Sequence, residues 1–510
     1  MEEGDYKKAP KEVFSPEKID PNSWTISRVP PRLREVNPEA YKPNVVSIGP
    51  YGRYEERTRA MEVVKENFFS SFIKETKRDR SEFEEAMKSI AERVNKCYQD
   101  YRGTYVQVDK LVRDGFFIVS LIRGKYPKEN FYQLGRIQTD IRYDLLLFEN
   151  QLPFFVLCHL DRIITSEGED EDACITTSEG EDEDACIIRI IMSEGEDEDA
   201  CIITSEGEDE DARITTSEGE DDRIITSEGE DEDASIITPE VEDDTFARLA
   251  LSLFRKEARR PAMWSEKYYP TGRNPNDFKH LLGLVHATCL PSAQGRKRHF
   301  DFKRKAEAKE PKSQRSWKFI RSATELEEAG IKFFGEQVQD KKNKSGVESL
   351  FDIEFTDDTK VLKIPTFHVD DNTERILRNL MAYEQSIPSS EPTYVSDYVT
   401  FMDNLINTGK DVQLLCNCGV VDNWLGDDEA VAQMVNKLRN NIYSSDDFYY
   451  AEIFGKVNEH CQRKWNKWKA TLKRDYFNSP WSLISFLAAV VLLLFTAIQT
   501  LFSVLSYVHQ

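Results

Sequence analysis

The sequence is short of the residues from which reactive and disulfide-linked sites are usually built. Its 510 residues include seven histidines and nine cysteines, and the odd number of thinly spread cysteines does not suit a disulfide framework. Reduced thiols in the cytosol are the simpler interpretation. A P-loop, a dinucleotide-binding glycine fingerprint, a nucleophile elbow and a zincin motif are all missing from the sequence. We therefore predict no cofactor and no catalytic residue of a familiar class.

Metal binding is a minor alternative for the cysteines. Cys416 and Cys418, together with His460 and Cys461, offer ligand types that zinc prefers, but their spacing is not a standard one. Because unpaired cysteine is commonly a small buried hydrophobic residue, we predict no metal site.

Charged residues are missing from the end of the chain. None occurs from Trp481 to Val508, and this stretch also lacks Pro and Gly. About 20 apolar residues suffice to cross a bilayer, so we predict a single transmembrane helix over residues 480–508. The alternative is a buried core helix of a soluble protein.

An apolar stretch typical of a secretory signal peptide is missing near Met1. Basic residues precede the predicted span, and such residues favour the cytosolic side of a membrane. We therefore expect the body of the protein to face the cytosol, at the plasma membrane or an endomembrane. The basic residues are Arg463, Lys464, Lys467, Lys469, Lys473 and Arg474.

The acidity of the chain is concentrated in one tandem repeat. The formal net charge is −24, yet residues 166–237 alone hold 29 Asp and Glu against three Arg, which leaves 63 acidic and 65 basic residues elsewhere. Clustered carboxylates repel one another, and each copy offers only a short apolar pair. We therefore predict a disordered insertion over residues 163–239. The near-identity of the copies fits recent duplication or an error in the gene model.

Each repeat contains a serine followed three residues later by Glu. This spacing suits an acid-directed kinase such as casein kinase two. The candidate phosphorylation sites are Ser166, Ser178, Ser193, Ser205, Ser217 and Ser227.

A basic run with two aromatic residues extends from Arg296 to Lys305. It leaves several interpretations open: a solvated loop, a nuclear localisation signal, a phosphate patch, a contact with anionic lipid, or an electrostatic latch with the acidic repeat. The body outside the repeat is close to neutral, so we predict no nucleic-acid partner.

Hydrophobic periodicity predicts a mainly α-helical domain with a small β-hairpin. The hairpin is predicted from the alternation at Phe351–Phe355 and the return over Val361–Phe367. One helix, Arg142–Leu160, is expected to bend at Pro153. The other predicted helices are Glu55–Lys77, Ser81–Tyr101, Leu111–Arg123, Thr245–Phe254, Asp277–Cys289, Ser322–Gly330, Thr373–Glu384, Tyr394–Asn407, Asp427–Asn441 and Phe448–Leu472.

Several short pieces of the sequence occur in a characteristic order. They are Tyr41–Tyr51, Met61 and Glu62 with Lys65, Asp114–Ile118, Asp144–Val156, His280–Leu282 with His286, Arg321–Gly330, Leu362–Pro365 and Asn379–Gln385. Together they resemble the plant "domain of unknown function 247" family. The resemblance covers about Pro30–Tyr507 apart from the repeat, and the Glu149–Phe155 piece is highly specific.

The resemblance implies one helical domain with a C-terminal hydrophobic segment, interrupted here by the repeat. We therefore divide the chain into a flexible segment over residues 1–40, the domain over residues 41–162 and 240–475, the repeat, and the predicted span. Family members usually carry a His where this chain has Gly52, so a role of that His in ligand binding would be lost here. The family is mostly uncharacterised, some members are associated with self-incompatibility recognition in grasses, and it supplies no catalytic residues.

Four polar residues lie in or beside the apolar Asp144–Val156 piece: Arg142, Asp144, Glu149 and Asn150. A buried carboxylate is costly unless it is paired, so we predict a structural polar network, with Arg142 or Arg136 as the partner of Asp144. The sequence thus favours a non-enzymatic, membrane-anchored component that binds an unknown protein partner, with no small-molecule substrate evident. The alternatives are an enzyme of unrecognised class with a carboxylate site near Asp144 and Glu149, and a nuclear or soluble protein.

Overall fold

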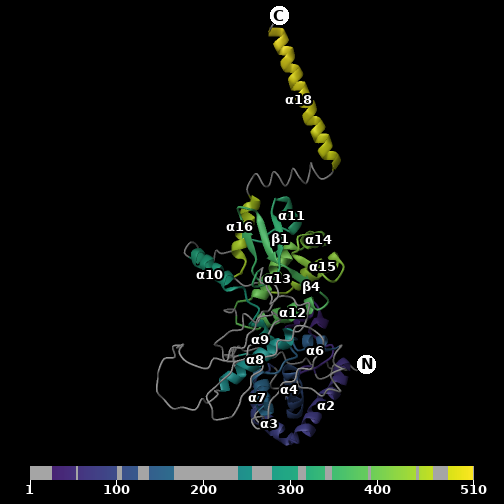
Figure 1. Cartoon of the computed structure of the whole chain (residues 1–510), viewed down its shortest axis with the longest axis vertical. Helices are drawn as coiled ribbons and strands as arrows, with labels where there is room; N and C mark the ends of the chain where they lie inside the picture. Colours follow the sequence, from purple (N-terminus) through teal and green to yellow (C-terminus); the bar gives the residue numbers. More distant parts are fainter. Residues whose placement is uncertain are drawn as a thin grey trace, which may run out of the picture. The chain divides into compact units, whose positions relative to one another are not determined.

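The structure is a computed structural model of the whole chain (Figure 1). It describes residues 26–52, 56–99, 106–124, 137–165, 239–255, 278–307, 318–338, 347–388, 392–443, 447–462 and 480–508. Of the insertion predicted to be disordered over residues 163–239, residues 166–238 lie outside this description, as do its six serines and the basic residues before the last helix. Its two ends differ from the prediction, because Ile163–Thr165 and Pro239 belong to the flanking helices. Residues up to Asp161 and residues from Pro239 onward belong to one structural unit, and Arg162–Thr238 form a second.

The fold includes residues from Ile26 onward, earlier than the sequence predicts, and residues 1–25 lie outside this description. Ile26 forms a β-bridge with Tyr98, and Ile26, Val29 and Leu33 are all buried. The prediction of a flexible segment over residues 1–40 is therefore wrong from Ile26 onward, because these apolar side chains pack into the core. Two short helices follow, α1 (Pro31–Arg34) and the 3₁₀ helix η1 (Pro38–Tyr41).

Three helices near the N-terminus pack through phenylalanine side chains. The ring of Phe69 lies 5.4 Å from that of Phe83 and 5.2 Å from that of Phe116, and Phe68 lies 5.4 Å from Phe117. These rings recur at helical spacing, so each helix turns one aromatic stripe toward the others. The helices are α2 (Arg59–Thr76), after the 3₁₀ helix η2 (Glu56–Thr58), α3 (Arg80–Lys96) and α4 (Val108–Arg123).

The single bent helix expected over Arg142–Leu160 is instead two helices with an irregular segment between them. Helix α6 (Gln138–Asp144) ends before Leu145, and α7 (Phe154–Thr165) begins after Pro153. The side chains of Asn150 and Gln151 provide the physical reason. They donate to the carbonyls of Asp144, Leu145 and Leu147, which a continuous helix would need for its own backbone.

Helix α12 (Thr373–Glu384) contacts elements that precede the repeat in the sequence and elements that follow it. It packs against η1, α9, α13 and α15, and every residue except Glu374 is buried. Its helical neighbours are α8 (Pro239–Arg255), α9 (Leu281–His286), α10 (Ala293–Glu307), α11 (Ala323–Glu328), α13 (Tyr394–Leu405), α14 (Gly409–Asn417), α15 (Asp428–Leu438) and α16 (Ala451–Gln462).

The β structure is larger than the predicted hairpin. Strands β2 (Glu354–Thr356) and β3 (Val361–Pro365) pair antiparallel, and β1 (Lys332–Glu336) pairs in parallel with the other edge of β3. A second ladder joins β4 (Phe367–Val369) and β5 (Val421–Asn423), also in parallel. Phe351 and Ile353 are buried but precede β2, so the first hairpin strand is shorter than the alternation suggests.

A close backbone approach joins β1 to the chain after α14. The N–H of Gly335 donates to the carbonyl of Cys418 (2.8 Å), and a Cβ on Gly335 would lie 2.0 Å from the carbonyl oxygen of Gly419. Backbone cannot move aside as a flexible side chain can. We expect Gly335→Ala to lower the free energy of unfolding by about 2–3 kcal/mol in urea denaturation. Gly455→Ala in α16, where a Cβ meets open space, is the control, and equal effects would contradict the assignment.

The last helix, α18 (Pro480–Val508), is long and apolar. Residues Ile484–Phe502 have a mean hydropathy of 2.3, and none of this window is buried against the protein. This is the one helix, among the residues the structure describes, that is long and apolar enough to cross a membrane.

Candidate functional site

The polar core of the protein surrounds a segment without regular secondary structure, Asn44–Gly49. The segment is buried from Val46 onward, so its backbone N–H and C=O groups need partners other than water. Side chains from three separate parts of the sequence supply those partners. We define this arrangement, the segment together with Asp144, Arg375, Asn150, Lys65 and Asp114, as the polar cradle.

The first wall of the polar cradle is the carboxylate of Asp144, at the end of α6. It accepts three successive backbone N–H groups, from Asn44 (2.8 Å), Val45 (2.7 Å) and Val46 (2.8 Å). It also forms an ion pair with Arg375 of α12, which in turn donates to the carbonyl of Lys42. Burial raises the pKa of the Asp144 carboxyl, while Arg375 and the three N–H donors oppose that rise.

Asn150 forms the second wall, and its side-chain amide hydrogen-bonds to both a backbone N–H and a backbone C=O of the segment. Its side-chain oxygen accepts the N–H of Ile48 (2.6 Å), and its amide nitrogen donates to the carbonyls of Val46 and Asp144, both at 2.9 Å. The side chain of Asn150 thereby links the segment directly to the residue that forms the first wall.

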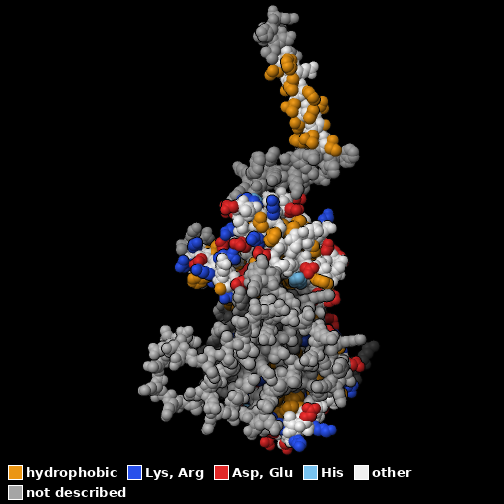
Figure 2. All heavy atoms as spheres, viewed as in Figure 1, with side chains coloured by type: hydrophobic (Ala, Val, Ile, Leu, Met, Phe, Trp, Pro, Cys, Tyr) orange, Lys and Arg blue, Asp and Glu red, His pale blue; other side chains and the backbone are white. Residues whose placement is uncertain are grey.

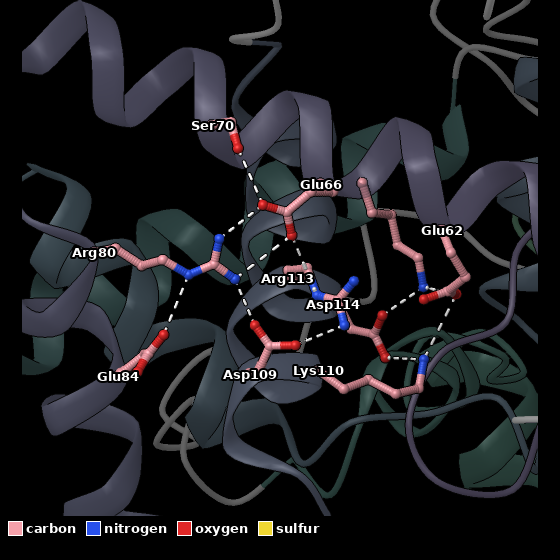
Figure 3. Close-up of polar contacts among 10 residues, drawn as sticks. Glu62, Glu66, Ser70, Arg80, Glu84, Asp109, Lys110, Arg113 and Asp114 are labelled. Carbon is pink, nitrogen blue, oxygen red and sulfur yellow. Dashed lines mark hydrogen bonds and ion pairs between the residues drawn. The ribbon is translucent and has the colours of Figure 1, made fainter.

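The third wall is an ion cluster between α2 and α4 (Figure 3). One carboxylate oxygen of Asp114 accepts the N–H of Gly49 (2.9 Å) and lies 2.8 Å from Nζ of Lys110, and the other oxygen pairs with Lys65. Lys65 is fully buried and also donates to the carbonyl of Ser47 (2.8 Å) and pairs with Glu62.

The two lysines of this cluster differ in their electrostatics. Burial lowers the pKa of both ammonium groups, but for Lys65 the carboxylates of Asp114 and Glu62 outweigh burial, and its pKa is raised. For Lys110 burial dominates and its pKa lies below the usual value. The cluster therefore contains two buried lysines, one firmly charged and one that gives up its proton more readily.

A more exposed set of ion pairs continues from this cluster (Figure 3). Arg80 of α3 contacts Glu66 (2.7 Å), Glu84 (3.2 Å) and Asp109, and Arg113 bridges Asp109 (2.7 Å) and Glu66 (3.5 Å). These side chains are about one-third exposed, so each pair contributes little to stability. Their geometric effect is to connect α2, α3 and α4 around the cluster.

The structure separates the four residues predicted to form one network. Asp144 and Asn150 both belong to the polar cradle, and Arg142 is buried on the same helix as Asp144. Glu149 lies elsewhere: it accepts the N–H of Val29 (2.6 Å) and pairs with Arg34.

The ion partner of Asp144 was missed at the sequence level. Arg375 lies 231 residues away in the sequence, and no local spacing connects it to Asp144. Lys65 gives no signal in the sequence beyond the family resemblance, because one lysine in an amphipathic helix is typical of a solvent-facing position.

Side chains in two other pieces that resemble the family also accept hydrogen bonds from backbone N–H groups. His280 accepts the N–H of Gly283 (3.1 Å) at the start of α9. Glu384 accepts the N–H groups of Val395 (2.9 Å) and Ser396 (2.8 Å), where it caps the first turn of α13.

The cysteines considered as metal ligands are unpaired. Cys416, Cys418 and Cys461 are free, and no cluster of three or more His, Cys, Asp or Glu suited to a metal ion occurs within the described ranges.

A half-buried carboxyl in α13 gives the stability a predictable pH dependence. Burial raises the pKa of Asp403 from 3.8 to about 6, with Arg439 opposing the rise. Its stabilising contribution is present below about pH 4 and is lost as the pH rises through 6. We expect Asp403→Asn to stabilise the protein by about 1 kcal/mol above pH 7, allowing for solvent screening, and to have no effect near pH 4. Denaturation at both pH values checks this, and a gain of equal size at pH 4 would contradict it.

Together, the fold and the polar cradle define a mainly α-helical protein whose buried charges hold an irregular segment, with one helix suited to a bilayer. The chain belongs to the plant protein family of unknown function designated DUF247, whose profile it matches over residues 26–495. This confirms the family predicted from the sequence pieces.

Two relatives from Arabidopsis thaliana agree with this membership. The UPF0481 protein At3g47200 is 24% identical over 506 residues, which cover 96% of this chain and 88% of the relative. The putative UPF0481 protein At3g02645 is 28% identical over 180 residues, which cover 35% of this chain and 32% of the relative. No solved structure shows significant similarity to the chain.

Proposed function

We propose that this protein is a non-enzymatic, membrane-anchored interaction component, with α18 as its anchor and the helical body facing the cytosol. The observation that carries the proposal is the apolar window Ile484–Phe502, which is unburied and has a mean hydropathy of 2.3. Nineteen such residues in a helix span about 29 Å, close to the thickness of a bilayer's hydrocarbon core. Exposed to water, this surface would be strongly unfavourable.

The polar cradle supports a structural rather than a catalytic role for its carboxylates. Asp144 and Asp114, the carboxylates with the deepest burial, have their oxygens directed at backbone N–H groups and at cationic side chains. A catalytic carboxylate needs an oxygen that can reach substrate. We therefore assign these residues a structural role, which leaves the surface of the body for a protein partner.

Proximity labelling tests this proposal. A labelling enzyme at the N-terminus of the full chain should mark the cytosolic faces of membrane proteins. Leu492→Arg together with Leu493→Arg places two charges in the middle of α18, each unfavourable by about 3 kcal/mol in a bilayer, and should replace these neighbours with soluble ones. Leu492→Ile with Leu493→Ile is the matched control and should behave as the unmodified chain.

Two results would contradict the proposal. Lumenal or apoplastic neighbours would show that the body faces the other side. An unchanged set of neighbours for the arginine variant would show that α18 is not the anchor.

A further inference from the structure

Helix α10 presents a cationic face to solvent. Its exposed positions include Lys297, Arg298, Phe300, Arg304 and Lys305, which fall on one side of the helix. Figure 2 shows Lys and Arg side chains gathered where Figure 1 places α10. We call these five residues the α10 outer face.

The opposite side of α10 is fixed to the body. The N–H of Gly295 donates to Ser292, whose own N–H and hydroxyl donate to Asp352 (3.0 and 2.9 Å). Lys303 pairs with Asp447, and the ring of His299 lies 5.0 Å from that of Tyr449. These contacts of the opposite side hold α10 to the body, and they do not use the side chains of the α10 outer face.

The charges of the α10 outer face are only partly neutralised within the fold. Arg298 pairs with Glu354 (3.0 Å), and Arg304 lies 3.6 Å from Asp301. Within the described ranges, Lys297 and Lys305 form no ion pair. Phe300 lies among these cations with 64% of its surface exposed.

We infer that the α10 outer face docks on the anionic headgroup surface of a bilayer, with Phe300 inserted at the interface. Charge complementarity selects an anionic partner. The exposed Phe300 ring selects a bilayer over a soluble polyanion, because only a bilayer offers both headgroup charge and an apolar layer beneath it.

The proposed anchor would bring this surface within reach of the α10 outer face. The 17 residues 463–479 separate α16 from α18, and at most ~3.5 Å per residue they reach roughly 60 Å. Tethering on this scale raises the effective concentration of the bilayer at the body. This part of the inference rests on the proposed function.

Amine footprinting of the full chain tests the inference. The protein is reconstituted in vesicles of phosphatidylcholine alone or with phosphatidylserine, and lysine acylation is followed residue by residue. Lys297 and Lys305 should react roughly tenfold more slowly in the anionic vesicles, and the difference should fall in high salt. Lys74 and Lys88, exposed on α2 and α3, should react equally in both.

Two double variants test whether the α10 outer face is the surface that contacts the bilayer. Phe300→Ser with Arg304→Glu should abolish the protection of Lys297 and Lys305. The matched pair on α2, Val63→Ser with Arg59→Glu, removes an equally exposed apolar side chain and one cation, and should leave the protection intact.

Flotation of the same samples separates this inference from the anchoring. Equal footprints in both vesicle types, in a chain that floats with both, would overturn the inference and leave the anchoring intact. Flotation with anionic vesicles alone, with Lys297 and Lys305 protected, would contradict the anchoring and support the inference. Equal protection by soluble polyglutamate in neutral vesicles would overturn docking on a bilayer in favour of an acidic polypeptide.

Discussion

Replacing Asp144 with Ala should lower the free energy of unfolding by about 3–5 kcal/mol, enough to unfold much of the protein at moderate temperature. The substitution leaves Arg375 as a buried cation without its partner carboxylate. It also removes the acceptor of three N–H groups, of Asn44, Val45 and Val46. Unsatisfied buried groups of this kind carry their full desolvation cost.

Urea denaturation in detergent, followed by circular dichroism, measures this effect. Asp358→Ala is the matched control, since Asp358 is exposed in the turn between β2 and β3, and its loss should change stability by less than about 0.5 kcal/mol. Similar, small effects of the two substitutions would show that Asp144 does not hold the Asn44–Gly49 segment.

The second large effect is expected at Lys65. Lys65→Met keeps the length of the side chain but removes the charge that Asp114, Glu62 and the carbonyl of Ser47 share. We expect a loss of about 3–4 kcal/mol. Lys110→Met should cost less, because burial already weakens the charged form of Lys110.

The comparison between these two lysine variants is the informative measurement. Thermal unfolding of both, side by side, should show the larger drop in midpoint for Lys65→Met. An equal or larger drop for Lys110→Met would mean that the ion cluster, rather than the backbone of the segment, is what Lys65 stabilises.

Local patterns in the sequence are sufficient to predict most helices of the domain. The prediction of a mainly helical protein is confirmed, and the Thr373–Glu384 helix has the predicted bounds because its apolar periodicity is regular and its ends are marked by polar residues. The family assignment is confirmed as well. These successes depend on information contained within short windows.

The features that were missed depend on contacts between distant parts of the chain. Strand β1 pairs in parallel with β3. Apolar and polar residues do not alternate in its sequence, Lys332–Glu336, regularly enough to predict a strand. Helix α10 lacks an apolar stripe, so its sequence indicates only a basic run. The break after Asp144 depends on side chains taking backbone carbonyls, which helical periodicity does not encode.

The polar cradle shows the same division. The sequence predicts one network for Asp144 and Asn150 because both lie beside the same apolar run, but it indicates neither Arg375 nor the segment that they hold. Several pieces that identified the family converge on that segment: Asn44–Gly49 itself, Lys65, Asp114 and the Asp144–Asn150 stretch. These pieces are therefore linked to one another by the hydrogen bonds that hold the segment.

The anchoring by α18 is the claim on which the functional proposal depends. Membranes from plant cells expressing the full chain can be washed with alkaline carbonate, which strips peripheral proteins, and then floated on a density gradient. We expect the full chain to float with the membranes after the wash. Release of the intact, full-length protein into the carbonate supernatant would contradict it.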